Sequence, residues 1–465
     1  MISFSKRAIL IGGLFAATGS LSTTPASAQA TTGIVPVVTL AEARARAATV
    51  DPDAVTARSR VETAVWRRRS ALTNLLTPNL AAGLSYTHFS EPFFNFGTGN
   101  ISPNSASATL DARYTVLGAG KFGELRSSRA FVESAEATEI ATRFRTALET
   151  DAAYFAVLAN RDLSRVVADR LKRAQEQLGI ARVRVVAGEA IASDSLQLLL
   201  EVSRARVAQL SRDSAVVASR LRLGRLIGLA GPAEAAPVDT AKPPPLPMSQ
   251  EQAIEEMRRR GPDVEAARAD ERSARATLSG ERERYFPEIT VGATSGRYDS
   301  RLFPSALRRS QYTVGIALPI WNGGAREFAV ARARAERDIA TATRADTERG
   351  AAEVMAQSYH GYLTSRSGID LALVGVAAAR ENYRVQRARY QEGATTILDL
   401  LEAQVALSES EAALIQARYS TRLALAQIEA LLGRRIFEGI TTTEKICDFP
   451  SCLYGTIGRT ECHSS

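Results

Sequence analysis

Two aspartates occupy matching places in the chain, and their spacing is the clearest sign of chemistry. Asp194 lies six residues after Gly188, and Asp399 lies six residues after Gly393. In both places a long helical pattern stops at the glycine and then resumes. Carboxylates that a fold gathers into one constriction favour cations over anions. The simpler role for such a residue is to cap the N-terminus of the resumed helix.

The other residue types give little support for catalysis. The chain has three histidines, His88, His360 and His463, which are far apart in the sequence. It has no nucleophile motif, metal-ligand cluster or phosphate-binding glycine loop. The three cysteines, Cys447, Cys452 and Cys462, all lie in the last twenty residues. A Cys447–Cys452 disulfide and free thiols are both compatible with this arrangement. The sequence therefore predicts neither an enzyme nor a bound cofactor.

The first 28 residues resemble a secretory signal peptide. Lys6 and Arg7 precede a short apolar run, and Ala26, Ser27 and Ala28 supply the small residues of a cleavage site. No later segment contains the roughly 18 uninterrupted apolar residues that a spanning helix needs. The mature chain is thus expected in the periplasm, outside the cell or in an outer-membrane barrel. Its net charge of +8 is spread among acidic residues, which argues against a nucleic-acid partner.

The chain contains two copies of one unit. ARVRVVAGEAIASDSL, which begins at residue 181, aligns with QRARYQEGATTILDLL, which begins at residue 386, and the offset of 205 residues persists downstream. A run of prolines separates the copies and cannot continue a helix. The predicted boundaries are 1–28 for the signal peptide, 38–231 for the first repeat, 232–247 for the linker, 248–435 for the second repeat and 436–465 for a disordered tail.

Each repeat has the same predicted order of elements: a helix, two strands, a very long helix and a return helix. The helices are expected at 53–76, 121–186 and 194–228 in the first repeat, and at 262–284, 326–392 and 396–432 in the second. A helix of about 65 residues extends about 100 Å, so the long helices must project away from the strands. Glycine supplies the positive φ that ends a helix, which makes Gly188 and Gly393 the tips of two antiparallel helix pairs.

The predicted strands have one apolar and one polar face. In TLDARYTV, from residue 109, Asp111 and Arg113 alternate with apolar side chains. Four strands cannot close a membrane barrel, since the smallest barrels have roughly eight. Either the hairpins lie on a helical bundle, or several chains pool their hairpins into one barrel. In a pooled barrel Asp111 and Arg113 face the lumen, and Phe122 and Trp321 lie at the membrane interface.

The sequence resembles the outer-membrane efflux protein family, the TolC-like channel-tunnels. The resemblance covers roughly residues 38–435 and rests on the doubled repeat, on LPIWNGGAREFAVARARA and on YQEGATTILDLLEAQVALSESEAALIQARYSTRLALAQIEALLG. It implies an α+β membrane protein that forms a homotrimer. Four strands from each protomer would build a twelve-stranded β-barrel in the outer membrane, continued by an α-helical coiled-coil tunnel across the periplasm.

The resemblance also implies partners and site residues. A periplasmic adaptor (a membrane fusion protein) would dock at the tips, Gly188 and Gly393, and connect to an inner-membrane pump of the resistance-nodulation-division or ABC type. A gate ring would use Asp399 and Glu402, and a latch between the tips would join Asp194 to Tyr390. Where some members strengthen this latch with an arginine, this chain has Thr395, so closure is expected to be looser or to use other residues.

The expected function is that of an exit duct in a tripartite efflux or secretion system. The alternative is a soluble periplasmic coiled-coil scaffold or adaptor, although adaptors normally carry one helical hairpin between β-rich modules. Drug efflux, metal-cation efflux and type I protein secretion share the channel architecture, so the cargo stays open. At the tips, the simpler alternative is that Asp399 caps the return helix and that Glu402 lies on a solvated helix face.

Overall fold

The computed structural model describes residues 35–95, 99–118, 120–188, 191–239, 241–301, 307–318 and 320–437. All the elements below belong to one compact unit that begins at Pro36. The predicted signal peptide, the three cysteines, His463 and the predicted tail beyond residue 437 lie outside the described residues.

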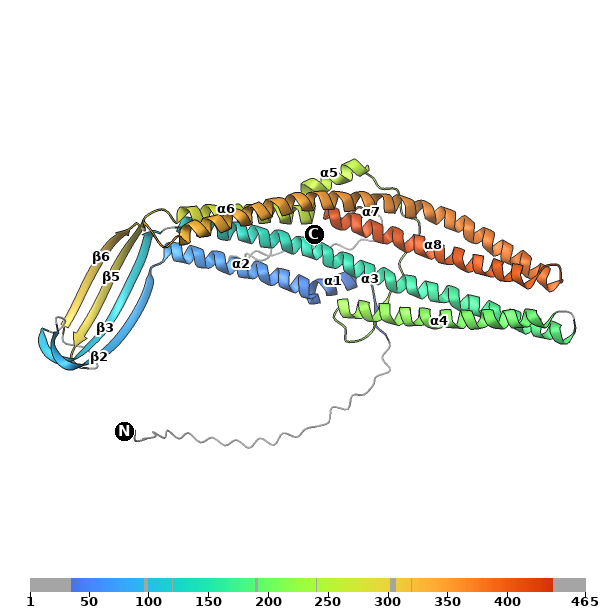
Figure 1. Ribbon diagram of the computed structural model, residues 1–465, viewed down its shortest axis with the longest axis horizontal. Helices are drawn as coiled ribbons and strands as arrows, with labels where there is room; N and C mark the ends of the chain where they lie inside the picture. Colours follow the sequence, from blue (N-terminus) through green and yellow to red (C-terminus); the bar gives the residue numbers. More distant parts are fainter. Residues whose placement is uncertain are drawn as a thin grey trace, which may run out of the picture. The chain divides into compact units, whose positions relative to one another are not determined.

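The helices follow the predicted order in two matched sets (Figure 1). The first set is α1 (Leu40–Val50), α2 (Pro52–Leu76), α3 (Lys121–Val186) and α4 (Ala192–Leu226). The second set is α5 (Gln250–Arg260), α6 (Pro262–Glu283), α7 (Ala325–Gln391) and α8 (Ile397–Leu432). The bounds of the long helices agree with the predicted ranges within a few residues. None of the described helices is long and apolar enough to cross a membrane.

The short helices α1 and α5 were not predicted as separate elements. Each ends just before a proline that opens the next helix, Pro52 in α2 and Pro262 in α6. Proline suits the first turn of a helix, where its missing N–H is not needed, but it cannot continue the helix before it. Asp51 reinforces the first of these breaks, because its side chain accepts hydrogen bonds from the backbone of Asp53 and Ala54.

Four long strands form a single antiparallel sheet. They are β2 (Asn79–Asn95), β3 (Asn100–Leu117), β5 (Glu288–Asp299) and β6 (Leu307–Ala317), in the order β2-β3-β5-β6. The two repeats thus meet where β3 pairs with β5, in a register that sets Asp111 opposite Thr294. The principal contacts of these strands within the described chain are with one another. The alternative of two hairpins lying on a helical bundle is therefore wrong.

The sheet leaves its apolar face uncovered. Val314 and Ile316 of β6 are 73 % and 74 % exposed, and Leu80 of β2 is 66 % exposed. Large apolar side chains that alternate along strands and meet no other part of the chain indicate an apolar environment outside it. Phe122 and Trp321, at the helix ends of the sheet, are also exposed.

The repeats are held together along the helices. α3 packs against α2, α4, α6 and α8, and α7 packs against α6 and α8. The predicted linker is structured where it crosses these helices. Its residues Glu234–Ala235 form β4, which pairs in parallel with β1 (Val37–Val38). Tyr154 of α3 donates a hydrogen bond of 2.7 Å to the carbonyl of Ala236, and Tyr362 of α7 donates one of 2.6 Å to the carbonyl of Pro244.

Candidate functional site

The two predicted helix tips have the backbone geometry that a glycine permits. α3 is followed by Gly188 at φ 76°, and α7 is followed by Gly393 at φ 75°. Other residues rarely adopt these left-handed conformations, so the glycines end the helices where the sequence pattern stops. Each return helix starts a few residues later, at Ala192 and at Ile397.

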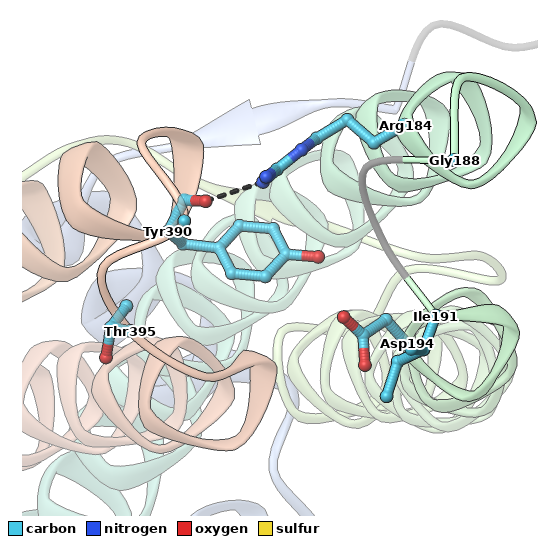
Figure 2. Close-up of a pocket in the computed structure, with 7 residues that line it drawn as sticks. Arg184, Gly188, Ile191, Asp194, Tyr390 and Thr395 are labelled. Carbon is cyan, nitrogen blue, oxygen red and sulfur yellow. Dashed lines mark hydrogen bonds between the residues drawn. The ribbon is translucent and has the colours of Figure 1, made fainter.

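A cavity of about 330 Å³ separates the two tips (Figure 2). Both hairpins contribute to its lining, which consists of Arg184, Gly188, Ile191 and Asp194 from the first hairpin and Tyr390, Gly393 and Thr395 from the second. The fold therefore brings together the two tip glycines and both predicted latch residues, which are about two hundred positions apart in the sequence.

Tyr390 contributes a buried aromatic side chain to this cavity. It is 5 % exposed and belongs to an apolar cluster with Leu198 of α4 and Leu400 of α8. Its hydroxyl points into the cavity toward Asp194 (Figure 2), but it makes no hydrogen bond to any described residue. Burial raises the pKa of Tyr390, and the charge of Asp194 raises it further. The predicted latch residues are thus neighbours without a hydrogen bond between them.

Arg184 makes the polar contact between the hairpins at this point. Its Nη1 donates a hydrogen bond of 2.7 Å to the backbone carbonyl of Tyr390, and its guanidinium lies 5.5 Å from the centre of the tyrosine ring. A cation over an aromatic face is attracted by the ring quadrupole. No motif in the sequence marks Arg184 as a functional residue. Its one available signal is position: it stands four residues, or one helical turn, before Gly188.

Asp399 caps the N-terminus of α8. Its carboxylate accepts hydrogen bonds of 2.6 Å from the Thr396 hydroxyl, 3.1 Å from the Thr396 backbone N–H and 2.8 Å from the Thr395 hydroxyl. The Thr396 hydroxyl accepts in return from the Asp399 N–H, which completes a capping box. The Thr396 hydroxyl bond, followed by the Thr395 one, holds the pKa of Asp399 below its usual value. The carboxylate is therefore ionised at neutral pH.

Glu402 lies three residues beyond Asp399 and is exposed, as Asp399 is. Residues three apart lie on the same face of a helix, so α8 presents two carboxylates side by side in its first turns. In the sheet, the predicted lumen residues lie on the polar face of β3. Asp111 accepts a 2.6 Å hydrogen bond from the Thr294 hydroxyl of β5, and Arg113 is exposed two residues further along.

A sequence model for outer membrane efflux proteins matches residues 71–229 and 253–434, which is most of the chain. The chain belongs to the outer membrane efflux protein family. It is 30 % identical over 358 residues to the pyoverdine export outer membrane protein OpmQ of Pseudomonas aeruginosa, which covers 72 % of this chain and 71 % of OpmQ. It is 23 % identical over 375 residues to outer membrane protein TolC of Escherichia coli, covering 77 % and 75 % of the two chains.

Solved structures show the same fold. The Campylobacter jejuni CmeC outer membrane channel matches with a TM-score of 0.75 at 17 % identity and covers 85 % of each chain. The open state of the Neisseria gonorrhoeae MtrE outer membrane channel matches with a TM-score of 0.71 at 20 % identity, covering 85 % of this chain and 89 % of that one. Together with the family match, they confirm the predicted TolC-like fold of strands and long helices.

This efflux protein is therefore an outer-membrane channel of the tripartite efflux and export type. The family assignment confirms the predicted location in the outer membrane and the prediction of a transport protein rather than an enzyme. It also decides against the soluble periplasmic scaffold or adaptor.

Proposed function

We propose that three copies of this chain close a twelve-stranded barrel and continue as a helical tunnel, which forms the exit duct of a tripartite system. The observation that carries this proposal is the four-stranded sheet, in which β2 and β6 each have one strand partner within the described chain. Backbone groups left unpaired at membrane depth cost several kcal/mol each. Pairing β6 of one copy with β2 of the next removes both edges.

The duplication supports the threefold arrangement. The family matches at 71–229 and 253–434 fall inside the two proposed repeats, 38–231 and 248–435. Each repeat contributes one strand hairpin and one long helix pair, so three chains supply six of each around the axis. Asp111 and Arg113 would then line the barrel lumen, while Val314 and Ile316 would face lipid.

At the opposite ends of the long helices, the proposed partner is a periplasmic adaptor that docks on the tips at Gly188 and Gly393. An inner-membrane pump of the resistance-nodulation-division or ABC type would supply the energy. The name of OpmQ states pyoverdine export, and that of Pseudomonas putida TtgC, 25 % identical over 64 % of its length, states a probable efflux pump. These names support small-molecule cargo over secreted protein or metal cations.

The tips also supply the proposed entrance gate. Asp399 and Glu402 of each copy would form a ring of about six carboxylates, which favours cations and resists complete closure by like-charge repulsion. We propose that Tyr390, beside Asp194, forms the latch between the two hairpins, and that Arg184 provides the charge-assisted bond that Thr395 cannot.

Disulfide trapping of the strand edges tests the trimer. In a variant whose three native cysteines are replaced by serine, Ser85→Cys on β2 is combined in turn with Gln311→Cys, Thr313→Cys or Gly315→Cys on β6. A disulfide forms only when the Cβ atoms approach within about 4.5 Å. At least one pair should yield covalent trimers of detergent-extracted protein on a non-reducing gel, and each single-cysteine variant should not. Monomers from every pair would refute the shared barrel.

A further inference from the structure

A second cavity, of about 400 Å³, lies where the helices meet the sheet, and cations dominate its charged lining. It is bounded by α2, the first turns of α3, the end of α6 and the first turns of α7. The charged residues around it are Arg67, Lys121, Arg284 and Arg326, with Glu124 and Glu281 as the acids. Glu281 forms an ion pair of 3.1 Å with Arg284, which leaves Arg67, Lys121 and Arg326 against Glu124, so the remaining charge in the cavity is positive.

Arg326 gives this cavity a buried donor. It is 8 % exposed, and one of its Nη atoms donates a 3.0 Å hydrogen bond to the Ile320 carbonyl. Its Nε is buried and has no hydrogen-bond partner among the described residues. The guanidinium also lies 4.7 Å from the centre of the Tyr285 ring. Arg326 is thus held in place by the polypeptide, and its contribution to the cavity is its positive charge.

The backbone adds to the positive potential. α3 and α7 both begin at the cavity, after Gly120 and Gly324, and neither of these N-cap glycines has a side chain to accept a hydrogen bond. In α7 the Asn322 side chain accepts a long bond of 3.5 Å from the Arg326 backbone N–H, whereas no described side chain caps α3. The first N–H groups of a helix carry partial positive charge and favour anions when no cap satisfies them. Two helix N-termini and four cationic side chains, one of them paired with Glu281, therefore surround one space, which is suited to a phosphate group.

One residue that lines the cavity, Lys121, also contacts a residue of the apolar face of the sheet. Tyr114 shares that face with Leu110, while Val116 lies at the register shift between Thr115 and Leu117. The ammonium of Lys121 lies 5.3 Å from the centre of the Tyr114 ring. The same ammonium donates to the carbonyl of Thr115 at 2.9 Å. Leu110 and Val116 are 56 % and 47 % exposed. An anion bound beside Lys121 would thus have an apolar surface directly next to it.

We propose that this cavity binds the phosphodiester headgroup of an anionic glycerophospholipid from the periplasmic leaflet, with the acyl chains against the apolar face of the sheet. The occupant is a lipid because the cation cluster and the exposed apolar residues adjoin. The exposed aromatic residues Phe122 and Trp321 flank the same junction, as aromatic side chains do at membrane interfaces. Free inorganic phosphate would use the cations and leave the apolar surface without a role.

The test is native mass spectrometry of the detergent-solubilised full-length channel titrated with phosphatidylglycerol or with phosphatidylcholine of identical acyl chains. We expect about tenfold tighter retention of phosphatidylglycerol, and we expect added salt to weaken this preference. Lys121→Gln with Arg284→Gln should reduce the preference about tenfold. The matched control is Arg206→Gln with Arg212→Gln, which removes two exposed cations from α4 and should change nothing.

Three results would overturn the proposal. Equal retention of the two lipids by the native channel would mean that the acyl chains bind without headgroup recognition, and this comparison needs no variant to fold. A preference that survives in the double variant of the cavity would place the lipid elsewhere. Displacement of bound phosphatidylglycerol by an equal concentration of inorganic phosphate would indicate a simple anion site.

Discussion

Removing the charge of Arg184 should weaken the closed state of the tips. The variant Arg184→Met keeps the length and apolar stem of the side chain but loses the 2.7 Å bond to the Tyr390 carbonyl and the contact with its ring. A hydrogen bond from a charged donor contributes about 1.5–3 kcal/mol, and a cation–π contact about 0.5–1 kcal/mol. Because Arg184 is only half-buried, we expect a loss of about 1–2 kcal/mol per protomer.

Single-channel recording in planar bilayers measures this loss as opening. Since 1.4 kcal/mol corresponds to a factor of ten in an equilibrium, the open fraction or mean conductance should rise by about tenfold if one protomer limits closure. Arg182→Met is the matched control, because Arg182 lies on the same helix two residues earlier and is exposed. Identical conductance of the two variants, both recovered as folded channels, would refute a role for Arg184 in closure.

The variant Tyr390→Phe distinguishes a latch made by the Tyr390 hydroxyl and Asp194 from one made by Arg184 with the Tyr390 carbonyl and ring. The tyrosine hydroxyl is buried without a hydrogen bond to any described residue, while the Arg184 contacts use the backbone carbonyl and the ring, which phenylalanine retains. Conductance of the Tyr390→Phe variant should therefore stay within about twofold of the native value, since a buried unpaired hydroxyl contributes no favourable bond. An increase as large as that of Arg184→Met would show that the hydroxyl, through Asp194, carries the closure.

Three further outcomes are expected. Asp399→Asn with Glu402→Gln removes the carboxylate charges while asparagine can still accept the capping bonds, so it should lower the cation-to-anion permeability ratio measured from reversal potentials. An unchanged ratio would count against the gate ring. Hydrogen bonds from Thr396 lower the pKa of Asp399, so its cap stabilises α8 above pH 3.8 and is lost as pH falls through the lowered value. The protection of the amides of residues 397–400, taken relative to their intrinsic exchange rate at each pH, should therefore fall only in that acidic range. A fall in protection near neutrality would argue against this cap. Asp151→Ala removes the buried carboxylate that accepts two hydrogen bonds from Arg44. The fold should lose about 3–5 kcal/mol of stability, measured as a lower thermal midpoint, and an unchanged midpoint would contradict this.

The helices were predictable because local signals set their ends. Pro262 opens α6, Gly188 and Gly393 end the outgoing helices, and Thr396 caps α8. The strands were only partly predictable: TLDARYTV covers residues 109–116, whereas β3 begins at Asn100. β2 extends to Asn95 and β3 begins at Asn100, whereas the alternating pattern covers only the halves nearest the helices. In the outer halves, proline and serine hide the alternation, and pairing between the strands supplies the order that side-chain pattern does not.

Contacts between distant residues account for the rest. β1 and β4 have two residues each, too few for a pattern, and they exist because their backbones pair across almost two hundred positions. Arg184 donates to the backbone carbonyl of a residue 206 positions away. Because every residue has a backbone carbonyl, this acceptor leaves no signal in the sequence. The cation-lined cavity likewise combines four helices whose arginines and lysine each look like ordinary solvated residues in the sequence.

The two aspartates that share a spacing after glycine have different surroundings, and this difference follows from the residues before them. Thr396 is the N-cap of α8, so Asp399 is drawn into a capping box and its charge is held by local hydrogen bonds. The N-cap of α4 is Ile191, whose side chain has no acceptor, so among the described residues α4 begins without a side-chain cap. Asp194 instead lies in the cavity beside the buried hydroxyl of Tyr390. The carboxylate thus has the same position in both repeats, at Asp194 and Asp399. Ile191 stands where the second repeat has the capping Thr396, and without that cap Asp194 faces Tyr390 of the other hairpin.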